Sequence, residues 1–219
     1  MTRLDDSEIR SKVLAELDWD PSIDASDVGV AIKDGVVTLT GTIPSYWQEK
    51  EVERVVKRIA GVRAVAEELT IKLPGASERG DADIAQSVVS GLRFNVAVPA
   101  NRIQVTVEKG WVTLEGQVEW QYQKAAAESE IKYLMGVKGV TNNIEIKPRV
   151  SSADVKAKIE AAFERLAQLD ANQITIESRD GKVVLRGSVR SWEEREQAEQ
   201  AAWAAPGVTM VENHVLVAQ

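Results

Sequence analysis

The sequence predicts an α+β protein built from three tandem αββαβ modules, each a three-stranded mixed sheet with two helices on one face. A repeated hairpin motif is the first observation behind this prediction, because it occurs at 34–41, 109–116 and 180–187. The copies are offset by 75 and then by 71 residues. The second observation is that every copy is surrounded by the same order of helical and alternating apolar periods.

Each module is expected to begin with a helix that leads into a β-hairpin. Asp6 and Ser7 are candidates for capping the first helix, and Asp83 takes this place in the second copy. The apolar positions at helical spacing are Ile9, Val13, Leu14 and Leu17; Ile84, Val88, Val89 and Leu92; and, in shifted register, Val155, Ile159, Phe163 and Leu166. The alternating positions of the next strand are Val28, Val30 and Ile32; Ile103, Val105 and Val107; and Ile174 and Ile176. An Asp-Gly or Lys-Gly turn joins this strand to a second one, whose apolar residues should face the core.

A second helix and a last strand complete each module. Capping boxes begin this helix in the first and third modules, and a glycine ends it in all three. These signals are Ser45-x-x-Gln48, Ser191-x-x-Glu194, Gly61, Gly136 and Gly207. The strand–helix–strand crossover predicts a last strand parallel to the second, and two helices leave the opposite sheet face open. The glycines expected at turns and caps are Gly35, Gly41, Gly61, Gly110, Gly116, Gly136, Gly181, Gly187 and Gly207.

The repeat divides the chain into domains at 1–74, 75–148 and 149–219, with short linkers at 74–77 and 148–151. Modules of roughly 70 residues bury only a marginal core. We therefore expect docking between neighbouring modules to contribute to stability.

The composition excludes several functional classes. The chain has no Cys and a single His, His214, which excludes disulfides, Cys-based metal sites and multi-histidine sites, so we expect no metal and no cofactor. The net charge of −7 opposes binding to nucleic acid and, at long range, to anionic membranes. No stretch is apolar enough for a transmembrane segment, and acidic residues stand where a signal peptide has its apolar core. We expect a soluble cytoplasmic protein, with a periplasmic location as the alternative if a signal has been removed.

Three further signals are better explained by ordinary structure than by chemistry. His214 should lie on an open sheet face with no second ligand near it in sequence, so we interpret it as a solvated side chain. Glutamates at 49–53 and 193–196 alternate with Lys and Arg at spacings typical of helix ion pairs, so we interpret these segments as solvated helix faces. The Gly-x-x-Gly segment at 136–139 lies between a helix and a strand, and its sister segments lack the second glycine, which argues against an RNA-binding loop.

Aromatic residues at positions where at least one sister module has a polar residue are the candidates for ligand or interdomain contacts. They are Trp47, Trp111, Trp120, Tyr122, Trp192 and Trp203. A lipid interface and packing between modules both favour indole rings, and we favour packing between modules. Trp120 replaces the Ser that caps the second helix in the outer modules, and an indole cannot cap. We therefore expect Trp120, with Tyr122, to dock against a neighbouring module.

The repeated unit resembles the BON domain. The resemblance rests on the αββαβ order, the Asp-Gly-Val-Val-Thr-Leu-Thr-Gly hairpin at 34–41, the Gly-Val approach to the last strand and its Asn142-Asn143-x-Glu145 type of ending. It covers nearly the whole chain in three copies. The resemblance implies a noncatalytic module that is associated with osmotic stress and the cell envelope, with phospholipid proposed as a ligand for some members.

These expectations lead to two hypotheses on function. The first is a noncatalytic stress-associated protein that binds phospholipid or another envelope component. The alternative is a protein–protein interaction scaffold that uses open sheet faces and exposed Trp residues. We do not expect an enzyme, because no catalytic constellation is present in the sequence.

Overall fold

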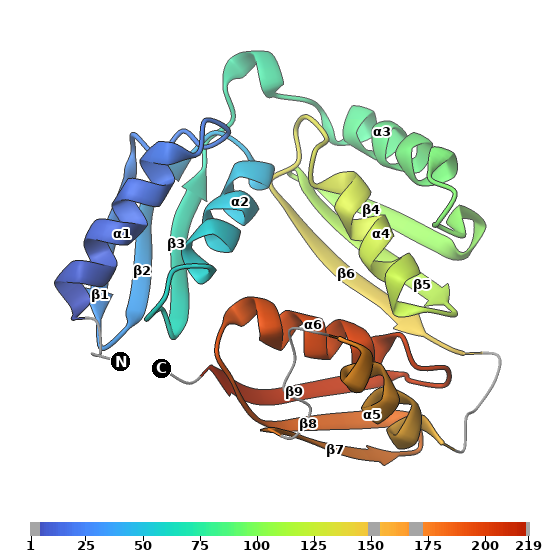
Figure 1. The fold of residues 1–219 in the computed structure, drawn as a ribbon. Helices are drawn as coiled ribbons and strands as arrows, with labels where there is room; N and C mark the ends of the chain where they lie inside the picture. Colours follow the sequence, from blue (N-terminus) through green and yellow to red (C-terminus); the bar gives the residue numbers. More distant parts are fainter. Residues whose placement is uncertain (1–4, 149–153, 167–172, 218–219) are drawn as a thin grey trace.

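A computed structural model describes residues 5–148, 154–166 and 173–217, so most of the predicted linker at 148–151 lies outside the described residues. Three αββαβ modules follow one another along the chain (Figure 1). Module 1 contains α1 (Asp6–Trp19), β1 (Val28–Lys33), β2 (Val36–Ile43), α2 (Tyr46–Lys57) and β3 (Ala64–Ile71). After the short helix η1 (Gly75–Ser77), module 2 contains α3 (Asp81–Phe94), η2 (Ala100–Arg102), β4 (Ile103–Glu108), β5 (Trp111–Val118), α4 (Gln121–Ile131) and β6 (Gly139–Ile146). Module 3 contains α5 (Val155–Arg165), β7 (Ile174–Arg179), β8 (Lys182–Val189), α6 (Trp192–Trp203) and β9 (Met210–Val217).

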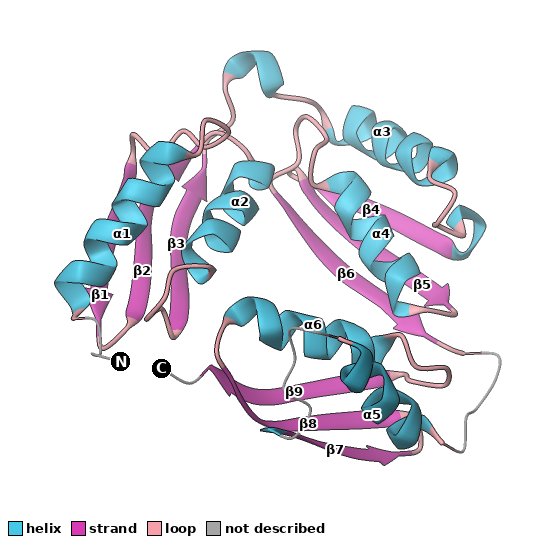
Figure 2. Cartoon of the chain, in the orientation of Figure 1, coloured by secondary structure: helices cyan, strands magenta, loops and turns pink. Residues whose placement is uncertain are grey.

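Each module has one three-stranded sheet with its second strand in the middle. β1 is antiparallel to β2, and β2 is parallel to β3, with Val37 opposite Val65. Modules 2 and 3 repeat this pattern. Helices cover one face of each sheet (Figure 2). The predicted α+β fold of three tandem modules is therefore confirmed, including the parallel last strand.

Each module encloses its own apolar core between its helices and its sheet. In module 1, Val37 and Leu39 of β2 are completely buried and pack with Ile9 and Val13 of α1. Their sister residues are buried in the cores of modules 2 and 3. Side chains alternate along a strand, so the polar neighbours of these residues point to the open face of the sheet.

A two-residue turn joins the strands of each hairpin. Asp34 and Gly35 both have positive φ angles, 53° and 76°, as a type I′ turn requires. The Asp6 carboxylate at the start of α1 accepts hydrogen bonds from the backbone N–H groups of Asp34 and Gly35, at 2.8 and 3.0 Å. Asp81 of α3 binds the turn of module 2 in the same way. The first helix of each of these modules is thus tied to its hairpin.

The three modules are arranged around a common centre, with α2 and α6 on the sides of their modules that face it (Figure 1). Residues of α2, α4 and α6 line one groove at this centre. The second helix of every module therefore contributes to the same region of the molecule.

Candidate functional site

Trp192, the first residue of α6, contacts module 1. Its indole Nε1–H donates a hydrogen bond to the backbone carbonyl of Val62 at 3.0 Å. The Nζ atom of Lys57, at the end of α2, lies 5.6 Å from the centroid of the Trp192 ring, and the guanidinium of Arg195 lies 5.3 Å from it. These distances are typical of cation–π interactions. One indole thus joins modules 1 and 3.

Tyr46 and Trp47, at the start of α2, contact module 2. Tyr46 is only 7% exposed and belongs to the apolar core of module 2, although it lies in the chain of module 1. This burial raises the pKa of the Tyr46 hydroxyl. Trp47 lies against Tyr133, with the ring centroids 6.0 Å apart and the planes tilted by 36°. Such a tilted pair is a favourable aromatic arrangement.

Tyr46 and Trp192 occupy the same position of the repeat, and the residue at that position in module 2 is Gln121. The two aromatic side chains each contact a neighbouring module. Gln121, which has no ring, lines the central groove together with Trp192. Tyr46 was not among the candidates from the sequence, although its alignment with the candidate Trp192 could have identified it.

The groove has a volume of about 620 Å³. Its walls carry three aromatic rings together with cationic, anionic and amide side chains. The lining residues are Lys57 from α2, Gln121, Tyr122 and Ala125 from α4, Trp192, Arg195, Glu196, Glu199, Gln200 and Trp203 from α6, and Ala204 after it. Tyr122 is 58% exposed. Trp203 also packs against the core of its own module, so only part of its ring faces the groove.

Both cations of the groove are held in place by neighbouring groups. Lys57 forms an ion pair with Glu53 on the same helix. The Arg195 guanidinium donates hydrogen bonds to the backbone carbonyls of Val215 at 3.0 Å and Asn213 at 2.7 Å. The groove therefore combines apolar surface with two oriented positive groups, an arrangement that suits an amphipathic molecule.

Trp120 is half-buried at the position that precedes α4. In place of a capping hydroxyl, the side chain of Gln123 reaches back, and its Oε1 accepts from the backbone N–H groups of Glu119 at 3.0 Å and Trp120 at 3.1 Å. This bond is the reciprocal half of a capping box. Docking of Trp120 against a neighbouring module stays a prediction.

A carboxylate cluster lies between α2 and β3, close to the contact with module 2. The Lys50 Nζ atom is 3.2 Å from a carboxylate oxygen of Glu53 and 3.3 Å from one of Glu67. Burial and the neighbouring Glu53 raise the pKa of Glu67. Burial also opposes ionisation of Glu53, but a hydrogen bond from Lys57 and the charges of both lysines hold its pKa below the ordinary value.

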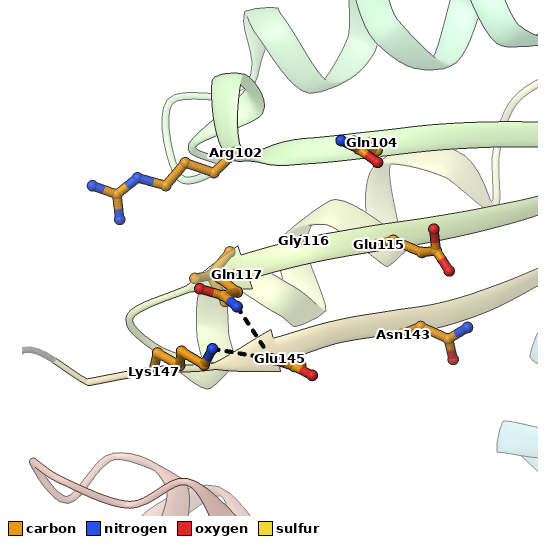
Figure 3. Close-up of a pocket in the computed structure, with 9 residues that line it drawn as sticks. Arg102, Gln104, Glu115, Gly116, Gln117, Asn143, Glu145 and Lys147 are labelled. Atoms are coloured by element: carbon orange, nitrogen blue, oxygen red, sulfur yellow. Dashed lines mark hydrogen bonds and ion pairs between the residues drawn. The ribbon is translucent and has the colours of Figure 1, made fainter.

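A second hollow lies on the open face of the β4-β5-β6 sheet and has a volume of about 760 Å³. Gln104, Glu115 and Asn143 form a row across the three strands (Figure 3). Gln117 and Lys147 both point toward Glu145, at 3.3 and 3.5 Å from its Oε2 atom. The full lining is Arg102, Gln104, Glu115, Gly116, Gln117, Val118, Asn143, Glu145 and Lys147.

Trp111 lies on the same open face, at the start of β5, and is 50% exposed. His214 lies on the open face of module 3, and its Nε2 is 3.7 Å from a carboxylate oxygen of Glu212. In the part of the chain that the structure describes, no group of three acidic or histidine side chains is placed to hold a metal ion. Within the same residues, no helix has the length and apolarity needed to cross a membrane.

The sequence is similar to known bacterial proteins over much of its length. It is 33% identical to osmotically-inducible protein Y of Escherichia coli K12 over 150 residues, which cover 66% of this chain and 74% of the relative. It is 30% identical over 142 residues to outer membrane lipoprotein DolP of Haemophilus influenzae, covering 64% of this chain and 73% of the relative.

A solved structure of the C-terminal domain of CdsD, a structural protein of the type III secretion system of Chlamydia trachomatis, covers 99% of this chain and 100% of its own. Its TM-score of 0.26 and sequence identity of 15% are too low to carry an argument. The sequence profile of the BON domain matches residues 5–72, 80–148 and 151–219, which is nearly the whole chain. This chain therefore belongs to the BON domain family, as its three αββαβ modules indicate.

Proposed function

We propose that this protein is a noncatalytic, stress-associated binding protein of the bacterial cell envelope, and that its central groove binds a phospholipid. The names of two relatives support the setting, because one is called osmotically inducible and the other an outer membrane lipoprotein. The phospholipid is what the resemblance to the BON domain suggests, and the chemistry of the groove supports it.

The observation that carries the proposal is the combination of aromatic and cationic groups in one groove. Trp192, Trp203 and Tyr122 offer rings to the apolar part of a ligand. Lys57 and Arg195 lie beside the Trp192 ring, and Glu196 and Glu199 line the same groove, so charges of both signs are present for a zwitterionic headgroup. The net charge of −7 opposes anionic membranes, so binding is expected to be weak and to depend little on salt.

The second candidate function is a protein–protein scaffold. It is favoured by apolar side chains on the open sheet face of module 3, where Met210 is half-exposed and Leu216 is largely exposed. An open sheet face with such side chains can pack against a partner protein. This function requires no contribution from the central groove.

Flotation with vesicles of a zwitterionic phospholipid, with and without an anionic phospholipid, tests the proposal. Trp203→Lys places in module 3 the residue that modules 1 and 2 carry at this position, and it is expected to reduce flotation several-fold. Trp19→Lys is the matched control, because Trp19 is 82% exposed at the end of α1 and lies outside the groove. The proposal is wrong if the protein does not float, or if both variants float like the parent. Tight binding that weakens steeply with salt would instead indicate a basic patch outside the groove.

A further inference from the structure

The open sheet face of module 2 is a second candidate binding surface, separate from the central groove. Its outward-facing residues form four rows across β4, β5 and β6. From one end of the face to the other, these rows are Glu108, Trp111 and Gly139; Thr106, Thr113 and Thr141; Gln104, Glu115 and Asn143; and Gln117 and Glu145. From Trp111 to Gln117 the face is about 20 Å long, at about 3.3 Å per strand residue.

The indole of Trp111 lies flat against the sheet at one end of this face. A Cβ atom at Gly139 would collide with three carbons of the Trp111 ring, so the ring occupies the space that glycine leaves free. The indole Nε1–H donates to Thr141 Oγ1 at 2.8 Å, which sets the orientation of the ring. One ring face is thus turned to the sheet while the side chain remains half-exposed. This is a rigid aromatic platform open to solvent.

The rest of the face is polar, and its two cations, Lys147 and Arg102, lie beside carboxylates. Lys147 lies 3.5 Å from Glu145, and Arg102 lies 3.0 Å from Glu119. A surface with paired cations has little attraction for a phosphate-rich or strongly charged ligand. Hydroxyl, amide and carboxylate groups arranged in rows are instead suited to many neutral hydroxyl groups.

From this arrangement we propose that the open face of module 2 binds a neutral oligosaccharide of a few sugar units. The apolar face of one pyranose ring stacks on the indole of Trp111. Hydroxyl groups of the following sugars exchange hydrogen bonds with Gln104, Glu115 and Asn143. The surface is specific to module 2, because the residues at the position of Trp111 are Val36 in module 1 and Lys182 in module 3.

Two substitutions taken from sister modules test this proposal. Trp111→Val introduces the residue of module 1 and removes the platform. Gly139→Ala introduces Ala64 of module 1 at the equivalent position, leaves Trp111 in place and forces its ring off the sheet. Neither substitution changes the charge of the face. Trp203→Lys serves as the control, because this residue belongs to the central groove.

The measurement is NMR titration of the ¹⁵N-labelled full chain with tetramers of glucose and of N-acetylglucosamine. The indole N–H signal that disappears in Trp111→Val identifies Trp111 among the six Trp residues. We expect this signal to shift with millimolar affinity for at least one tetramer. Backbone amide signals of β4, β5 and β6 report the affinity in every variant, including Trp111→Val. We expect unchanged affinity in Trp203→Lys and an affinity at least tenfold weaker in Trp111→Val and Gly139→Ala. The proposal is overturned if neither tetramer shifts the Trp111 signal, or if both sheet variants bind like the parent while their backbone spectra show a folded module 2. Vesicle flotation does not enter this test, so it can fail independently of phospholipid binding.

Discussion

At the scale of single residues, Glu67 departs from the pattern of the other modules. Its sister residue in module 2, Asn142, donates from Nδ2 to a carboxylate oxygen of Glu128 on α4 at 3.1 Å, and module 3 repeats this bond. In module 1 the same contact would join the carboxylates of Glu67 and Glu53. Lys50 lies between them, and its charge offsets their repulsion. The cluster therefore depends on the ionisation of Glu67.

Replacing this residue by its sister, Glu67→Asn, is expected to stabilise module 1 at neutral pH by up to about 1 kcal/mol. Burial raises the pKa of Glu67 above its ordinary value of 4.5 in the folded chain. The folded state then binds more protons than the unfolded state in the window above 4.5, so the carboxylate lowers the free energy of unfolding as the pH rises through that window. Urea unfolding should show the gain of the variant at neutral pH and no gain well below pH 4.5. Lys50 keeps Glu49 and Glu53 as partners, and a variant less stable than the parent at neutral pH contradicts this account.

At the scale of secondary structure, the periods of the sequence predicted the α-helices and strands in their order, but not the short helices η1 and η2. The expected caps were wrong by one to three residues, because Asp5 and Gly80 precede α1 and α3 in place of Asp6 or Ser7 and Asp83. A turn such as Lys109-Gly110 needs positive φ at both residues, and glycine accepts this conformation without strain. The apolar positions then fall on the covered face of the sheet because side chains alternate along a strand. The periods did not predict the two hydrogen bonds between the hairpin turn and the first helix. These bonds join Asp81 to Lys109 and Gly110, which lie 28 and 29 residues further along the chain.

Asp81→Ala removes the acceptor of two hydrogen bonds and is expected to destabilise module 2 by about 1–3 kcal/mol, because it leaves the N–H groups of Lys109 and Gly110 without their partner. Hydrogen exchange of these two amides, together with urea unfolding, measures the effect. Asp83→Ala removes a negative charge from the same first turn of α3, so it controls for the interaction with the helix dipole. Equal losses in the two variants would show that the dipole, and not the tie to the turn, is responsible.

At the scale of the whole molecule, docking depends on aromatic residues at the start of the second helices. Tyr46 enters the core of module 2, and Trp192 binds the backbone of Val62 in module 1. Gln121 occupies this position in module 2, next to the groove. The three modules thus share one repeat, while the contacts between them differ.

Trp192→Gln, which introduces the residue of module 2, is expected to weaken the contact between modules 1 and 3 by less than about 1.5–3 kcal/mol, the contribution of a fully buried large apolar side chain, because Trp192 is only half-buried. Small-angle X-ray scattering should then give a larger radius of gyration, and calorimetry should separate the melting transitions. Glu193→Gln, at the exposed neighbouring position, is the control.

Trp120→Ser, which restores the capping hydroxyl of the sister modules, is expected to loosen the assembly in the same way if Trp120 docks. A variant as compact and as cooperative as the parent would show that its indole does not hold modules together.

The sequence by itself determined the three-fold repeat, the order of elements and the apolar cores, because these depend on local periods and turn chemistry that recur at a constant offset. It also marked Trp111 and Trp192 as unusual, since both stand at positions that differ between modules. The tertiary structure alone decided what those rings touch. Tyr46 lies in the core of another module, and the flat position of Trp111 depends on the missing side chain of Gly139 on a neighbouring strand. Such contacts join residues far apart in the chain, so the hydrophobic periodicity within a module cannot predict them.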